Sequence, residues 1–377
     1  MSRLEAHRRS SRSGRRRLAV TAIAFALATT LAVVPAGATG GGGHGGGNGG
    51  EMTVLADGLL SPLHLDVHGQ RNRPDVLVSQ SFMGMISRVE KGGVTDVVEQ
   101  PGGFTGGMQA GPYGTLAYLA ADEVSTYLKV MLPGGKVKTI ADLGAFEKAE
   151  NPDQVNDYGL QGATPECIKS LPPELPIAPY PGLEDSNPYE LLVARHGAYV
   201  ADAGGNTILF VTWSGRIRTV AVLPPQPEVI SAEIADATGL PECVVGLTMN
   251  FEPVPTDVEN GPGHYLYVSS LPGGPEDASL GARGGVFKVG PQDGWVKQIG
   301  TGFLGASNLA VDPWGSIYVT ELFGNRISKL VNGGPVAYKQ INQPAAIEWF
   351  DGRLYATADA LPPEEGPPAG KVVSFRP

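Results

Sequence analysis

The chain has 377 residues, of which 42% are hydrophobic and only 18% are charged, and it contains 53 glycines and 32 prolines. Turn-forming residues at this density exclude a mainly helical protein and indicate many short strands joined by tight turns. The formal net charge of −10 argues against binding nucleic acid or an anionic lipid surface by charge.

Residues 1–38 have the three parts of a secretory signal peptide. Six arginines between Arg8 and Arg17 form a basic region, residues 18–34 are an uncharged apolar run, and Ala36-Gly37-Ala38 offers small residues for cleavage. An uncleaved anchor is the alternative, because the apolar run is about long enough to span a bilayer. The arginine run resembles a twin-arginine signal only in part, so the export route, Sec or twin-arginine, stays open.

The predicted mature protein is secreted and acidic. Cleavage after residue 38 removes seven of the 28 basic and one of the 38 acidic residues, which leaves 21 against 37 and a net charge of −16. Residues 39–51 are nearly all glycine and predict a disordered linker. We expect no membrane contact after signal cleavage.

A short phrase recurs along the rest of the chain: a turn, an alternating apolar run ending in Tyr-Val or a relative of it, and a small or acidic residue. Six copies occupy residues 75–80, 114–119, 197–202, 264–269, 315–321 and 352–357. Copies of one half-buried strand, each flanked by further short strands, predict a radial array of β-sheets.

Residues 52–377 therefore predict one all-β domain, a six-bladed β-propeller. Blades of four antiparallel strands fit residues 63–99, 107–143, 189–223, 255–299 and 308–340. The sixth blade, 346–375, lacks one strand, and residues 52–56 supply it from the N-terminal end. Closure by this strand removes the exposed edges of the ring.

Two insertions, 143–187 and 224–254, interrupt the repeat. We expect helices near residues 143–150 and 229–237 and no set of strands in either insertion. The two cysteines, Cys167 and Cys243, lie one in each insertion and both follow a Pro-Glu pair. An even pair in an oxidising compartment predicts one disulfide; the alternative is two free thiols.

Several motifs resemble the ScyD/ScyE family, exported NHL-like proteins named after two members of the scytonemin pigment operon and common in actinobacteria. They are Glu252-Pro253-Val254-Pro255-Thr256-Asp257-Val258, Leu271-Pro272-Gly273-Gly274-Pro275-Glu276-Asp277, Ser279-Leu280-Gly281-Ala282-Arg283-Gly284, Ala201-Asp202-Ala203-Gly204-Gly205-Asn206, Leu309-Ala310-Val311 and Tyr318-Val319-Thr320-Glu321. The resemblance covers nearly all of residues 52–377. It implies a secreted six-bladed propeller of undefined biochemical role and brings no catalytic residues.

One position in each blade begins the innermost strand and is predicted to point into the central channel. The six residues are His64, Met108, Glu190, Asp257, Asn308 and Ala346. His64, Glu190, Asp257 and Asn308 are the candidate ligand-binding residues at the channel mouth. Oxygen ligands from Glu190, Asp257 and Asn308 would suit Ca²⁺, although we expect no cofactor. The alternative is that these polar groups only satisfy backbone groups, and a one-residue slip would turn them away.

Two functions from different classes fit this chain. The first is a secreted binding or scaffold protein that presents the insertions to an extracellular protein, glycan or small molecule. The second is a metal-dependent hydrolase or lyase at the channel, similar to gluconolactonase-like and paraoxonase-like propellers. A structural cell-surface role is a third. No nucleophile elbow, H-E-x-x-H or C-x-x-C motif is present, and catalytic residues stay unknown.

Overall fold

In the computed structural model, the described residues are 51–172, 177–275 and 279–377, and they belong to one compact unit. The predicted signal peptide and all but the last residue of the predicted linker lie outside these residues. No helix in these three ranges is long and apolar enough to cross a membrane.

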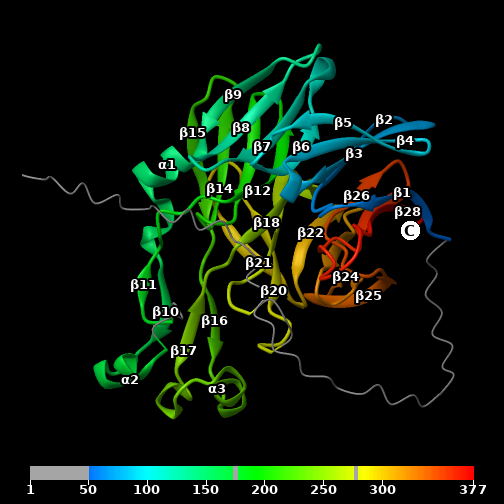
Figure 1. Cartoon of the computed structure of the whole chain (residues 1–377). Coiled ribbons are helices and arrows are strands. Elements are labelled where there is room, and N and C mark those ends of the chain that lie inside the picture. The colour runs from blue at the N-terminus through cyan, green and yellow to red at the C-terminus, as the bar shows by residue number, and fades with distance from the viewer. Residues whose placement is uncertain (1–50, 173–176, 276–278) are drawn as a thin grey trace, which may run out of the picture. The chain divides into compact units, whose positions relative to one another are not determined.

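Six four-stranded antiparallel sheets form the blades (Figure 1), and in five of them the strands follow chain order. These five are β2 (Leu65–Gln70), β3 (Arg73–Gln80), β4 (Met85–Glu90) and β5 (Gly93–Glu99); β6 (Phe104–Ala110), β7 (Leu116–Ala121), β8 (Thr126–Met131) and β9 (Val137–Asp142); β12 (Pro188–Ala194), β13 (Gly197–Asp202), β14 (Thr207–Thr212) and β15 (Ile217–Val222); β18 (Pro255–Gly261), β19 (Tyr265–Ser270), β20 (Gly284–Val289) and β21 (Val296–Phe303); β22 (Ala306–Val311), β23 (Ile317–Glu321), β24 (Arg326–Val331) and β25 (Gly334–Gln340).

The sixth blade joins both ends of the described chain. Its strands are β26 (Ile347–Phe350), β27 (Arg353–Ala358), β28 (Gly370–Phe375) and, at the outer edge, β1 (Thr53–Leu59). β1 pairs antiparallel with β28, with Thr53 opposite Ser374. The first strands of the blades contact one another in a closed cycle, β2 to β6, β12, β18, β22, β26 and back to β2. The predicted six-bladed propeller and its closure by the N-terminal strand are confirmed.

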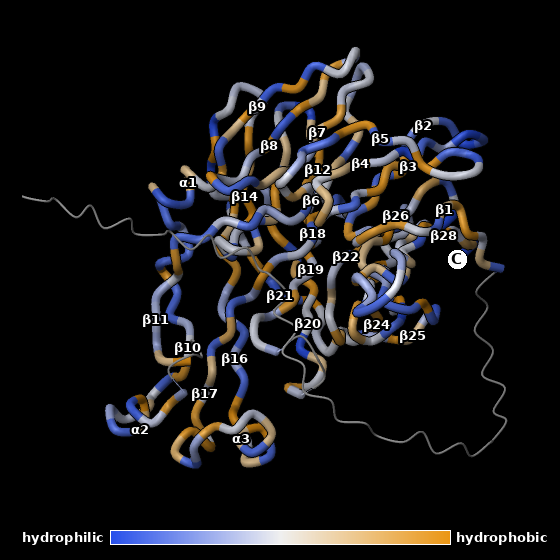
Figure 2. Tube along the Cα trace, in the orientation of Figure 1, coloured by the Kyte–Doolittle hydropathy of each residue, from blue (hydrophilic) through white to orange (hydrophobic). Residues whose placement is uncertain are grey.

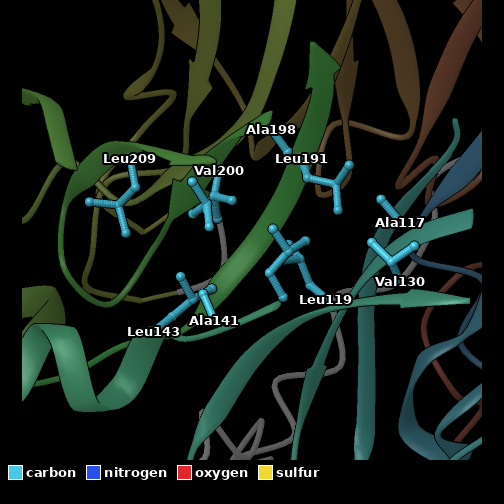
Figure 3. Packing of buried hydrophobic residues seen from close by; sticks show 11 residues of the cluster. Ala117, Leu119, Val130, Ala141, Leu143, Leu191, Ala198, Val200 and Leu209 are labelled. Atoms are coloured by element: carbon cyan, nitrogen blue, oxygen red, sulfur yellow. The ribbon is translucent and has the colours of Figure 1, made fainter. Parts of the chain in front are cut away.

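The hydrophobic core lies between the blades. Figure 2 shows apolar and polar residues alternating along β8, whereas β7 is apolar over most of its length, as expected for a strand that packs on both faces. Figure 3 shows the cluster between the second and third blades, where Leu119 and Leu143 face Leu191, Val200 and Leu209. Similar clusters fill the other five blade interfaces.

The two insertions together form a seventh four-stranded sheet, which corrects our expectation that they contain no strand set. Its order is β11 (Tyr180–Pro181), β10 (Asp157–Gln161), β17 (Thr248–Phe251) and β16 (Gln226–Val229). We call this sheet, with α2 (Pro165–Ser170), α3 (Ala232–Thr238) and the 3-10 turn η4 (Glu242–Val244), the insertion module. It has its own small core and is not a blade of the ring.

The predicted disulfide is confirmed. Cys167 in α2 is bonded to Cys243 in η4, with 5.8 Å between the Cα atoms. The bond joins the two insertions across 76 residues of sequence. No described cysteine is free.

The helices in the insertions have local causes. The predicted helix α1 spans Leu143–Glu150, and the Asp142 side chain caps it by accepting from the Ala145 N–H. α3 starts at Ala232, later than predicted, because Ser231 caps its first turn and Val229 belongs to β16. Four further 3-10 turns are η1 (Ser81–Met83), η2 (Pro112–Gly114), η3 (Pro152–Val155) and η5 (Pro262–His264).

The long connections all leave the ring at one end. Residues 143–187 and 224–254 connect the last strand of a blade to the first strand of the next, and residues 271–283 and 359–369 join second strands to third strands. In an antiparallel blade both kinds of connection lie at the end where the innermost strand begins. We call this end the loop face.

Candidate functional site

The predicted channel residues occupy equivalent backbone positions near the loop face. Glu190 pairs with Ala201, Asp257 with Ser269 and Asn308 with Thr320, and each of these partners holds the same place in its strand phrase. His64 precedes β2, and its carbonyl accepts from the Ser79 N–H at 3.0 Å. A β-bulge lies just before each of Glu190, Asp257 and Asn308. Bulges of this kind redirect the side chain that follows them.

Two of the channel residues tie neighbouring blades together. Asp257 accepts from its own neighbour Val258 N–H at 2.7 Å and from Leu309 N–H of the next blade at 2.8 Å. Asn308 Oδ1 accepts from Ile347 N–H of the blade after that at 2.8 Å. These side chains therefore satisfy backbone donors at the blade interfaces.

His64 and Glu190 form the one close pair among the four predicted channel residues in the described structure. His64 Nδ1 lies 2.9 Å from Glu190 Oε2, and Glu190 Oε1 accepts from Leu191 N–H at 3.0 Å. This contact joins the first blade to the third, and Gly107 of the second blade lies directly against Glu190. A Cβ atom on Gly107 would lie 1.7 Å from Glu190 Oε1, so glycine is what makes room for this contact.

The predicted register was wrong for Met108. It pairs with Tyr118, two steps further along the strand than the other five residues, and it packs in the core between the first two blades. The irregular segment Gly106-Gly107 takes its expected place. Ala346 does lie in the expected register, since its carbonyl accepts from Thr357 N–H at 3.0 Å, but it offers no polar side chain.

A second tier of carboxylates lies two residues further along three inner strands. Asp66, Glu259 and Glu348 pair with the equivalent residues Leu77, Tyr267 and Tyr355. The sequence analysis did not identify these three carboxylates. It could have done so, because residues two apart in a strand lie on the same face, and each carboxylate follows His64, Asp257 or Ala346 by two residues.

The carboxylates of the two tiers influence one another electrostatically. Burial raises the pKa of Glu190 and Asp257 well above the ordinary range, and repulsion from nearby carboxylates adds to this. Burial, and then repulsion among acids of four blades, does the same to the pKa of Glu259 and Glu348. Since the last two side chains are partly exposed, water reaches the second tier. The channel carboxyl groups therefore keep their protons to a higher pH than isolated carboxyl groups do.

Two histidines, His64 and His68, are hydrogen-bonded to carboxylates of these two tiers. Burial lowers the pKa of His64 to about 3, so with Glu190 shifted upward a neutral pair sharing one proton is favoured. His68 lies in β2, and its Nδ1 is 2.7 Å from Asp66 Oδ2. This hydrogen bond raises the pKa of His68.

Access to the first tier is restricted. His64 is fully buried between the rings of Tyr189 and Phe104, and its Nε2 has no hydrogen-bond partner among the described residues. A shallow pocket of about 390 Å³ lies between α1 and β15, and a second of about 20 Å³ lies beside Arg283 and Phe323. None of the four predicted channel residues lines either pocket.

The ligand and metal predictions for these residues stay predictions. In residues 51–172, 177–275 and 279–377, no three Asp, Glu, His or Cys side chains are grouped closely enough to hold a metal ion by themselves. Calcium between Glu190, Asp257 and Asn308 would need further oxygen ligands or a rearrangement, because both described Asp257 oxygens and Asn308 Oδ1 already accept backbone hydrogen bonds.

Comparison with solved structures finds other propellers. An aldose sugar dehydrogenase from Streptomyces coelicolor in its PQQ-bound form is 14% identical with a TM-score of 0.53, covering 87% of this chain and 98% of that one. A gluconolactonase from Xanthomonas campestris is 11% identical with a TM-score of 0.52, covering 87% and 89%. A virginiamycin B lyase from Staphylococcus aureus is 15% identical with a TM-score of 0.49, covering 87% and 99%. No family model and no curated protein matches the chain. At these identities the likeness shows the propeller fold alone.

Proposed function

We propose that this protein is an extracellular binding protein that recognises a protein partner through the insertion module on the loop face. The propeller acts as a rigid base, and the channel acids hold the blades together. The observation that carries the proposal is that the predicted channel residues are engaged or covered. Asp257 and Asn308 accept backbone hydrogen bonds, and His64 is fully buried.

The insertion module has the surface of a binding element. The exposed large apolar side chains in its elements and directly after β11 and η4 are aliphatic, with Leu183 54%, Val229 58% and Val245 40% exposed. β16 is an edge strand of the module sheet, so a partner strand has backbone groups to pair with. The disulfide between α2 and η4 fixes the two insertions to each other, which lowers the entropy lost on binding. Aliphatic side chains beside an open strand edge suit a polypeptide better than a glycan.

Secretion and membership of the ScyD/ScyE family belong to the same proposal. A disulfide that joins two insertions is typical of proteins that mature in an oxidising compartment. The signal-like residues 1–38 and the acidic mature chain agree with an extracellular location.

The test uses the chain from residue 39 onward, added to washed envelopes of the producing cells. We expect retention on the envelope that falls at least tenfold in the double variant Val229→Asp with Val245→Asp. The matched control is Val137→Asp on the outer strand β9, a valine of similar exposure at 43%. Equal retention of all three proteins would overturn the proposal.

A lactonase- or esterase-like hydrolase is the second candidate, favoured by the His64–Glu190 pair and the buried, unpartnered Nε2 of His64. Its test is the hydrolysis of δ-gluconolactone and of p-nitrophenyl acetate with about 1 mM Ca²⁺. Turnover that is lost in both His64→Gln and Glu190→Gln would support this candidate against the binding protein. We expect no turnover above that of the buffer.

A further inference from the structure

Unpartnered buried oxygens gather at one place outside the channel. Buried polar atoms in proteins almost always have hydrogen-bond partners. Seven buried side-chain oxygens in the described residues have none, and four of them belong to Glu147 (both carboxylate oxygens), Asn151 and Asp153. These three residues lie within one short stretch, at the start of the first insertion. A fifth, Thr207 Oγ1, belongs to the residue paired with Asp202 in the third blade.

Local backbone structure brings the three residues together. Glu147 lies on the buried side of α1 and is 1% exposed. Asn151 ends the helix in the left-handed conformation with φ 36°, which turns the chain directly into η3. Asp153, in that turn, is completely buried.

Glu147 and Asp153 both face the turn between β13 and β14. A Cβ atom on Gly205 of this turn would lie 2.8 Å from Glu147 Oε2, so the carboxylate is packed against bare backbone. Asp153 Oδ2 accepts from Asn206 Nδ2 at 2.9 Å, while Oδ1 has no donor. On the other side, a Cβ atom on Gly182 would lie 2.0 Å from Asp153 Oδ1.

The charge of this cluster is not balanced by protein. The nearby carboxylate of Asp202 is already engaged, because its oxygens accept from Ser186, Asn187 and Gly205. None of the seven ion pairs among the described residues involves Glu147, Asp153 or Asp202. Buried carboxylate oxygens without any donor are rare in proteins, and a bound cation would supply the partner that these oxygens lack.

We propose that Glu147, Asn151 and Asp153 bind one Ca²⁺ ion, which fastens the first insertion to the third blade. The donors are all oxygens, and Ca²⁺ takes six to eight oxygens in flexible geometry. Since no three acidic or imidazole side chains of the described residues suffice for a metal by themselves, the amide of Asn151, main-chain carbonyls and water complete the ligand set. Zn²⁺ prefers nitrogen and sulfur, and Mg²⁺ demands a stricter octahedron.

The site goes beyond the proposed binding function, because it controls how the insertion module is held. η3 leads directly into β10, the first strand of the module sheet. Asn156 in the same segment donates to the Leu223 carbonyl of the third blade at 3.0 Å. A cation bound beside this contact therefore fixes the start of the insertion module on the ring.

The test measures calcium binding to the chain from residue 39 onward after removal of metal with a chelator. We expect one Ca²⁺ per chain by isothermal titration, and a rise in the melting temperature of about 5 °C at a hundredfold excess over Kd. Mg²⁺ at the same concentration should give a much smaller rise. No binding at about 1 mM Ca²⁺ would overturn the proposal.

Two matched carboxylate-to-amide variants locate the ion. Glu147→Gln should abolish the calcium-induced shift while raising the melting temperature of the metal-free protein, because it replaces a buried carboxyl group whose two oxygens accept no hydrogen bond. This combination distinguishes a lost ligand from a damaged fold. Asp257→Asn, in the channel, should keep the shift. A shift that survives Glu147→Gln and disappears in Asp257→Asn would overturn the site and assign the ion to the channel.

Discussion

The channel and the junction beside Glu147 both collect buried carboxylates, but only one of them uses these groups as structure. Asp257 and Asn308 reach to the next blade and accept a backbone N–H there. At the junction, both oxygens of Glu147 and one of Asp153 accept nothing among the described residues. Polar acceptor side chains thus hydrogen-bond neighbouring blades to each other in the channel, whereas at the base of the insertion module their oxygens remain available to bind a cation.

The difference shows how to judge a buried acid in a propeller. Removing a channel acceptor leaves a buried backbone N–H without a partner, which costs about 1–3 kcal/mol. Removing Glu147 leaves no donor unsatisfied, because none binds it. Whether a buried acid has hydrogen-bond donors, more than its burial or its pKa, therefore distinguishes a structural acid from a candidate ligand of a cation.

Deleting residues 53–59 should have the largest effect, and it acts on the ring alone. The deletion removes β1, exposes the edge of β28 and takes Ala56 and Leu59 out of the core. We expect a loss of more than about 4 kcal/mol in unfolding free energy, measured by urea unfolding followed by circular dichroism. Deletion of 39–50 is the control, and equal midpoints for the two deletions would contradict ring closure by β1.

Replacing both cysteines by serine should act on the insertion module and spare the ring. The Cys167–Cys243 bond closes a loop of 76 residues, and removing such a bond typically costs about 2–4 kcal/mol. We expect faster amide exchange in β10 and β17 and unchanged exchange in β13 and β19, measured by hydrogen–deuterium exchange with mass spectrometry. Uniform acceleration across all four strands would show that ring and module unfold as one unit.

Two glycine substitutions compare the regions directly. In Gly107→Ala the new Cβ meets Glu190 Oε1 at 1.7 Å and Glu190 Cα at 2.7 Å, so backbone must move. In Gly205→Ala the contact is with the end of the Glu147 side chain, at 2.8 Å. We expect losses of about 3 and about 1 kcal/mol respectively in urea unfolding. The reverse order would mean that the channel adapts more easily than the junction.

The propeller was predictable because the same strand motif occurs six times in the sequence. Each strand phrase carries period-two alternation and a turn, and the count of strands required β1 to complete the sixth blade. The register of the second blade was not predictable in this way, because Gly106-Gly107 absorbs an extra residue that side-chain patterns do not reveal.

The insertion module and the cation site were not predictable from the sequence, for physical reasons. β10 and β17 are short strands that pair although about ninety residues separate them in the sequence. β11 has only two residues, and β16 contains a proline, which is rare inside strands. None of the four strands therefore shows a clear alternating pattern. Glu147, Asn151 and Asp153 lie in one short stretch, but the sequence does not reveal that they are buried or that their oxygens lack donors. That burial arises only when α1 and η3 pack against the turn between β13 and β14 in the folded chain.

The smallest expected effect is the pH dependence of stability, which arises mainly in the channel. Groups whose pKa is raised in the folded state hold protons that the unfolded chain has released, so stability falls as pH rises above about 4.5 toward the folded pKa. His64, with a pKa lowered to about 3, acts in the opposite direction only below its unfolded value of 6.5. Above pH 6.5 the carboxyl groups whose pKa is raised therefore decide the sign.

In that pH range we expect the unfolding free energy to fall, by less than about 1.4 kcal/mol per pH unit for each proton retained, in urea titrations without calcium. Glu348→Gln should make the dependence shallower, because it removes one raised carboxyl and its repulsion of the others. Glu147→Gln removes a second contribution near pH 8, where saturating calcium should have the same effect in the unmodified protein. If calcium leaves the slope of the unmodified protein unchanged while Glu147→Gln flattens it, the ion does not bind to Glu147, and the contrast between channel and junction loses its chemical basis.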